Sequence, residues 1–208
     1  FGAKREVGRA TSSDVLKWLE RRYSAPEWRL FAELRNGTGW ARDSGIADAI
    51  AMNMWPSGGY AIHGIEIKVS RGDWLREAKN EKKNDGVRRY CDAWYIAVPD
   101  DTIVKAGELP QGWGLLRVGE DATRAIVKAA ALDPVPMDRG FAAVLIRAAA
   151  DAQEIGERQA QKAAMLKAPL RAISAFENGV FVLSCGHRAT RPRGFKTPKT
   201  VRCIECSQ

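Results

Sequence analysis

The sequence predicts an α/β protein with a mixed central sheet flanked by helices, followed by a long helix and a small cysteine-rich module. Three features of the 208 residues predict this arrangement. Two apolar runs between Ile46 and Ser70 flank the turn signal Pro56-Ser57-Gly58-Gly59, as in a β-hairpin. The continuous apolar run Ala93–Val98 is typical of a central strand buried on both faces. Three cysteines and one histidine gather after residue 180.

The helices and strands follow from periodicity and from capping residues. Two helices are expected before the hairpin, and the second of them is started by Pro26 and ended by Asn36-Gly37. After the hairpin, a capped helix and a short helix precede the buried strand, and two further strands follow it. The helices are expected at 11–23, 26–35, 70–79 and 86–90, and the further strands at 112–118 and 125–130. This order of elements fits a mixed sheet with helices on its faces.

A single long helix is expected from Asp138 to about Lys167, between Pro136 and Pro169. Apolar residues in its first half would dock on the core. Its second half, rich in Ala, Glu, Gln and Lys, would act as a spacer or as a partner helix in a homodimer. The predicted domains are therefore a core at 11–133, a connecting helix at 138–168 and a module at 176–208.

Composition and charge limit the class of protein. A hydrophobic content of 45% is typical of a globular chain, and the net charge is +8. The basic excess lies just after the hairpin and at the C-terminus, which favours a polyanionic partner, although a charge-rich helix at 71–89 is equally consistent with a solvated surface. Since no apolar run approaches the ~20 residues that span a bilayer, and no signal-peptide profile is present, we expect a cytoplasmic protein without membrane contact.

The hairpin brings three chemically reactive side chains together. Folding about Ser57–Gly58 places Asp48 opposite Glu66 or Ile67, and the period of two places Glu66 and Lys68 on one face. Carboxylate oxygens are ligands for Mg²⁺ or Mn²⁺, and a neighbouring lysine can position the attacking water. The alternative is an edge hairpin whose charged face meets water. The apolar run around Asp48 argues against that alternative, because lone carboxylates are seldom buried unless paired or bound to metal.

Asp48 followed by Glu66-Ile67-Lys68 resembles the acid…Glu-x-Lys signature of the PD-(D/E)XK nuclease superfamily. The surrounding sequence is similar to the DNA-repair nucleases called MmcB-like. The residue before Asp48 is Ala47 rather than the proline of the family name. The resemblance implies a restriction-endonuclease-like fold and a Mg²⁺- or Mn²⁺-dependent deoxyribonuclease. Asp48, Glu66 and the Ile67 carbonyl would hold the metal, and Lys68 would orient or deprotonate the water.

The resemblance also implies a role for Glu33. Many members of the superfamily place a glutamate on the helix before the core strands, where it contacts the metal or its waters, and Glu33 resembles that residue. Its alternative is an ordinary surface glutamate. Basic side chains around the site are expected to contact DNA phosphates. The residues are Arg42 in the loop at 36–45, Arg71 after the hairpin, and Lys83, Arg88 and Arg89 in the next segment, which we expect near the metal-holding strand ends.

The C-terminal residues predict a second metal site. Cys185-Gly-His187 and Cys203-Ile-Glu-Cys206 are two short ligand pairs that can close a tetrahedral Cys₃His site, which favours structural Zn²⁺. The arrangement resembles a small zinc ribbon; the alternative is three reduced cysteines beside a free histidine. The segment between the pairs carries basic residues and Phe195, which suit DNA binding. The expected contacts are Arg188, Arg191, Arg193, Lys196 and Lys199.

The sequence is consistent with three functions. The favoured one is a metal-dependent DNA nuclease with a basic zinc-binding module. A second is a non-catalytic nucleic-acid-binding protein on a nuclease-like fold. A third is a protein-interaction adaptor built on the zinc ribbon and the long helix.

Overall fold

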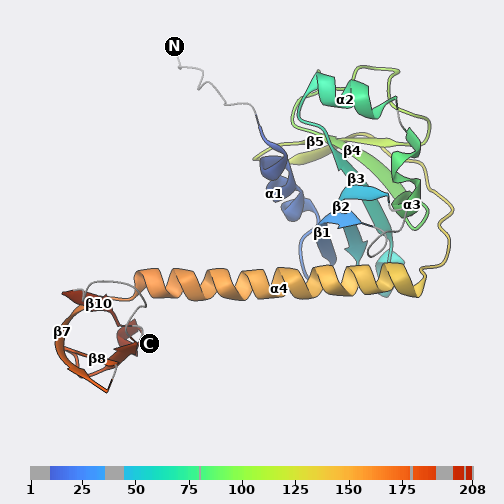
Figure 1. The fold of residues 1–208 in the computed structure, drawn as a ribbon. Helices are drawn as coiled ribbons and strands as arrows, with labels where there is room; N and C mark the ends of the chain where they lie inside the picture. Colours follow the sequence, from blue (N-terminus) through green and yellow to red (C-terminus); the bar gives the residue numbers. More distant parts are fainter. Residues whose placement is uncertain are drawn as a thin grey trace, which may run out of the picture. The chain divides into compact units, whose positions relative to one another are not determined.

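The computed structural model describes residues 10–35, 45–79, 81–178, 180–190, 199–203 and 205–207. The chain divides into two compact units, Phe1–Ala149 and Ala150–Gln208 (Figure 1). The long helix α4 (Arg139–Lys167) contributes its first turns to the first unit and the remainder to the second.

The first unit contains a six-stranded mixed sheet in the order β1-β2-β3-β4-β5-β6. Its strands are β1 (Trp28–Arg35), β2 (Ile46–Asn53), β3 (Ile62–Ile67), β4 (Ala93–Val98), β5 (Gly114–Val118) and β6 (Thr123–Val127). Strands β3, β4 and β5 are mutually parallel, whereas β1–β2, β2–β3 and β5–β6 are antiparallel. The mixed sheet expected from the sequence is confirmed. Because β4 is buried along its whole length, it is the central strand that its apolar run predicts.

Helices pack on both sides of this sheet. The helix α1 (Ser12–Arg22) is capped by Thr11 and buries Val15 and Leu19 in one hydrophobic cluster. A second cluster joins Trp74 of α2 (Arg71–Glu77) and Val87 of α3 (Asp85–Arg88) to the start of α4. The predicted docking of α4 is confirmed, since Phe141, Val144 and Leu145 are buried in this cluster. Short 3-10 turns occur at Pro56–Gly58, Glu81–Asn84 and Glu205–Ser207.

The helix predicted at 26–35 is wrong. Trp28–Arg35 forms the strand β1, paired along its length with β2. Leu, Ala, Glu and Arg favour a helix in isolation, but pairing with β2 and burial of Leu34 decide the conformation. Glu33 therefore lies on a strand and not on a helix.

The second unit holds a four-stranded sheet in the order β10-β7-β8-β9. The strands are β7 (Leu170–Glu177), β8 (Val180–Leu183), β9 (Arg188–Thr190) and β10 (Thr200–Arg202). Its small core is Phe181, Leu183 and Cys203, with the other cysteines packed against them. Among the described residues of this unit, so few buried apolar side chains stabilise an independent fold poorly, which makes a metal ion the expected support.

Candidate active site and metal centre

The register of the hairpin is the one predicted from its turn. Ala49 pairs with Ile65 and Ala51 with His63, so Asp48 comes opposite Glu66. The backbone N–H of Ile67 donates to Asp48 Oδ2 at 2.8 Å. This contact ties the two strands together at the carboxyl end of β3, next to the parallel strand β4.

Lys68 lies at the centre of the predicted triad. Its Nζ is 2.8 Å from Glu66 Oε2 and 3.7 Å from Asp48 Oδ2. Glu66 is 1% exposed and Lys68 10%, whereas Asp48 is 41% exposed. The structure thus brings together the three side chains that the sequence pattern singled out, with Asp48 on the solvent side.

A third carboxylate, from Glu77, completes the group and was missed by the sequence analysis. Its Oε2 lies 3.0 Å from Lys68 Nζ, and its side chain is 6% exposed. The signal was present but weak: Glu77 follows the buried Trp74 by three residues, which places both on one side of α2. A glutamate in a charged helix otherwise gives no indication of burial.

Burial and neighbouring charges shift the pKa values of this group. Desolvation, followed by the charge of Asp48, raises the pKa of Glu66 to about 7. Desolvation lowers the pKa of Lys68, but Glu66, Asp48 and Glu77 outweigh it, so the net shift is upward. For Glu77 desolvation is again the largest single effect and raises the pKa, but the two lysines beside it produce a net decrease. Lys68 is therefore held as an ammonium ion among the carboxylates.

An open cavity of about 560 Å³ adjoins this group. Asp48, Lys68, Glu77 and Glu33 line it, together with the first turn of α1. Glu33 lies opposite Asp48 in the β1–β2 register, between the pairs Ala32–Ala49 and Leu34–Ala47. Its φ of 49° is left-handed, a conformation that costs a non-glycine residue about 1–2 kcal/mol. Although the predicted helix is wrong, Glu33 reaches the same cavity from a strand.

The basic residues expected around this site have different surroundings. Lys83 lines the cavity, and its Nζ is 3.3 Å from Glu77 Oε2. Arg71 donates to Glu108 and to the carbonyl of Ile103, so its guanidinium ties α2 to the loop after β4.

Arg88 and Arg89 do not lie where they were expected. The neighbouring Asp92 N–H donates to the carbonyl of Ile62, so this segment lies where β3 and β4 begin and not where they end. Arg88 pairs with Asp85, and Arg89 donates to the Tyr90 hydroxyl. Arg42 lies outside the described residues.

His63 is packed on the opposite face from Glu66, because it lies three residues before Glu66 on the same strand. Tyr23, Trp28 and Tyr95 surround its ring, and the Tyr23 hydroxyl is 3.2 Å from Nδ1. Burial, then the charge of Arg22, lowers the pKa of His63 to about 4, although Asp92 opposes this shift.

We expect this neutral histidine to make folding sensitive to mild acid. Between pH 6.5 and 4 the unfolded chain protonates His63 and the folded chain does not, so stability present above pH 6.5 is lost as the pH falls. The loss between pH 7 and 5 should be about 2 kcal/mol. Urea unfolding at both pH values should show a smaller decrease in His63→Gln than in wild type. Equal decreases in the two proteins would exclude His63 as the cause.

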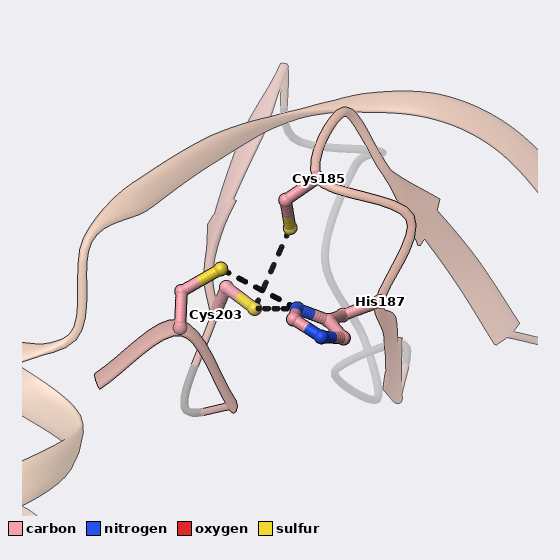
Figure 2. A group of neighbouring side chains, drawn as sticks. Cys185, His187 and Cys203 are labelled. Carbon is pink, nitrogen blue, oxygen red and sulfur yellow. Dashed lines mark hydrogen bonds between the residues drawn. The ribbon is translucent and has the colours of Figure 1, made fainter. Parts of the chain in front are cut away.

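The C-terminal ligands meet at one point. The ligand atoms of Cys185, His187, Cys203 and Cys206 all lie within 4.8 Å of one another, and the cysteines are reduced. Figure 2 shows Cys185, His187 and Cys203 pointing toward one another. His187 Nδ1 is 3.4 Å from Cys203 Sγ and 3.3 Å from Cys206 Sγ, and the Cys185 and Cys203 sulfurs are 3.6 Å apart. This cluster could hold a metal such as zinc.

The spacing of the cluster agrees with tetrahedral zinc. Bonds of about 2.3 Å to sulfur and about 2.0 Å to nitrogen separate tetrahedral ligands by about 3.8 Å for two sulfurs and about 3.5 Å for sulfur and nitrogen. The backbone N–H of His187 donates to the Cys185 sulfur, and this contact is the main cause that lowers the pKa of Cys185 to about 6. Arg171 contacts Cys206 and Cys185, and Glu205 lies 3.6 Å from His187 Nε2. Such outer contacts orient ligands and balance their charge.

The basic surface expected around this cluster is described only in part. Arg188 is exposed and lies 3.7 Å from Glu177, and Lys199 is exposed. Arg202 donates to the carbonyls of Leu166 and Ala168, so it caps the end of α4. Arg191, Arg193 and Lys196 lie outside the described residues.

Comparisons with known proteins identify a similar fold but no family. No family model and no curated protein matches the chain. A solved structure of a protein of unknown function from Silicibacter pomeroyi is similar, with a TM-score of 0.52 and 22% identity. The match covers 76% of this chain and 93% of that one. At this identity the likeness concerns the fold alone. Of the helices in the described ranges, none has the length and apolar character needed to cross a bilayer.

Proposed function

We propose that the chain is a Mg²⁺- or Mn²⁺-dependent nuclease of the PD-(D/E)XK type that hydrolyses phosphodiester bonds of DNA. Asp48, Glu66 and Lys68 would form its active site at the carboxyl end of β3, and the first unit would be restriction-endonuclease-like. Support comes from the meeting of these three side chains next to an open cavity, which Asp48 and Lys68 line. The order β1–β2–β3 places the carboxylates on adjacent strands, as metal-dependent phosphodiester chemistry needs.

A buried oxygen of Glu66 is the main support for the proposed metal site. Glu66 Oε1 is buried and has no hydrogen-bond partner within the described ranges, whereas Oε2 accepts from Lys68. A buried carboxylate oxygen without a partner is unfavourable, and a divalent cation would satisfy it. Asp48, Glu66 and the Ile67 carbonyl supply hard oxygen donors of the kind that Mg²⁺ prefers. The residues present therefore fit the metal.

Each residue around the cavity would have a separate role in the reaction. When bound, the metal supplies charge neutralisation at the scissile phosphate and activation of water. Asp48 and Glu66 would bind and orient it. Lys68, fixed by its carboxylate partners, would orient the attacking water or hold the developing negative charge. Glu33 also lines the cavity, where it would help to bind the metal or its waters, and Lys83 would contact a substrate phosphate.

We further propose that Cys185, His187, Cys203 and Cys206 bind structural Zn²⁺ and that the basic residues of this module bind DNA. The distances within the cluster support the first part. The exposed Arg188 and Lys199 support the second. A dimer formed through α4 stays a prediction.

A cleavage panel tests the nuclease. The purified protein should cut at least one of single-stranded, duplex, nicked or branched DNA in the presence of Mg²⁺, and RNA substrates test the preference for DNA. Glu66→Ala should lose this activity, because it removes the buried carboxylate oxygen that the proposed metal would bind. Binding to DNA without cleavage of any substrate would favour the non-catalytic alternative. Weak DNA binding that is unaffected by Arg188→Glu and Lys199→Glu would favour the protein adaptor.

A further inference from the structure

Glu77, at the end of α2, is buried and makes polar contacts with three side chains. Its Oε2 accepts from Lys68 Nζ at 3.0 Å and from Lys83 Nζ at 3.3 Å. Its Oε1 accepts from Asn84 Nδ2 at 3.2 Å. Asn84 is completely buried, so this contact holds the carboxylate from within the protein interior. Three donors thus hold one carboxylate that is 6% exposed.

Stability alone does not account for this arrangement. Replacing a buried ion pair with well-packed apolar residues is often neutral or stabilising, because desolvation offsets much of the charge attraction. Lys68 already contacts Glu66 at 2.8 Å, so a second buried carboxylate beside it adds a further desolvation cost. The effect of Glu77 is geometric instead. Contacts with both Glu66 and Glu77 restrict the ammonium group more than one contact would, and Lys68 still lines the cavity.

We infer that Glu77 is a positioning residue for Lys68 in the cleavage reaction. It holds the Lys68 ammonium beside Asp48 and Glu66, and it holds the half-exposed Lys83, which lines the same cavity. This inference rests on the proposed nuclease function. Glu77 itself does not contact the substrate; it acts through the two lysines.

The inference separates the effects of three variants on the cleavage kinetics. Glu77→Ala should lower kcat by about 10–100-fold, because Lys68 loses a contact behind the reacting group. It should also raise KM, because Lys83 loses the same partner. Glu77→Gln keeps the shape and an acceptor oxygen, so it should recover much of this kcat. Lys83→Met should raise KM and leave kcat near wild type. Asp101→Asn removes an exposed carboxylate paired with Arg117 and should change neither.

A second measurement does not depend on cleavage. The rate of amine acetylation, followed by mass spectrometry, reports how accessible and how readily deprotonated each lysine amine is. The exposed Lys17 serves as the reference within each sample. Lys68 should be protected in wild type and in Glu77→Gln but react several-fold faster in Glu77→Ala. Urea unfolding of each variant separates this local effect from loss of the fold.

The outcomes are distinguishable. If wild type does not cleave, the nuclease proposal fails, and the acetylation result alone decides whether Glu77 holds Lys68. A wild-type kcat in Glu77→Ala would overturn the positioning role, and so would unchanged protection of Lys68 in that variant. An equal loss of kcat in Glu77→Ala and Glu77→Gln, matched by an equal loss of unfolding free energy, would reduce Glu77 to a structural residue.

Discussion

Replacing Lys68 with methionine is expected to lower the rate of phosphodiester cleavage on the order of 10³-fold. It should also lower the free energy of unfolding by about 3–5 kcal/mol, because Glu66 would stay buried without a counter-charge and Glu77 would keep only the half-exposed Lys83. Both quantities follow from the same ammonium group, which lies within 3.7 Å of three carboxylates. Single-turnover cleavage and urea unfolding measure them separately.

A double variant separates catalysis from stability. Glu66→Gln combined with Lys68→Met removes the isolated charge, so it should recover much of the unfolding free energy without recovering cleavage. A Lys68→Met protein that cleaves at the wild-type rate would contradict the role of Lys68. A double variant no more stable than Lys68→Met would contradict the electrostatic explanation.

Loss of the C-terminal metal is expected to have the largest effect on the second unit. Wild type should contain about one zinc ion per chain, and Cys203→Ser should lose it. Because structural zinc contributes about 10–16 kcal/mol of apparent binding free energy, the small core of Phe181, Leu183 and Cys203 should not stay folded without it. Elemental analysis and hydrogen exchange of β7 and β8 measure the two effects.

The remaining cysteine provides the control for zinc. Cys91 is buried in the first unit and distant in sequence from the cluster, so Cys91→Ala should retain the metal. A full equivalent of zinc in Cys203→Ser, or unchanged protection of β7 and β8 after metal loss, would contradict a structural role for the cluster.

The hairpin was predictable because its determinants are local. The turn at Pro56–Gly58 and the alternation after it fix the register, and the register alone brings Asp48 opposite Glu66. The cysteine and histidine spacing was informative for the same reason. Two knuckles of fixed length can meet around one metal whatever lies between them.

The strand β1 and the role of Glu77 were not predictable in this way. The residues of β1 favour a helix by intrinsic propensity. They are extended because they pair with β2, which is separated from β1 by residues 36–45. Glu77 acquires its burial from contacts with Lys68, Lys83 and Asn84, which lie on other segments. Likewise, nothing in the sequence around Arg71 indicates that Glu108 binds its guanidinium.

Mg²⁺-dependent DNA cleavage tests most directly whether Asp48, Glu66 and Lys68 form a nuclease site. Zinc-loaded protein dialysed free of Mg²⁺ is mixed in excess with end-labelled DNA, and Mg²⁺ is then added in steps. The single-turnover rate should rise from zero to a plateau in wild type and stay near zero in Asp48→Asn. Absence of cleavage at every Mg²⁺ concentration, or a rate unaffected by Mg²⁺ or by Asp48→Asn, would contradict this assignment.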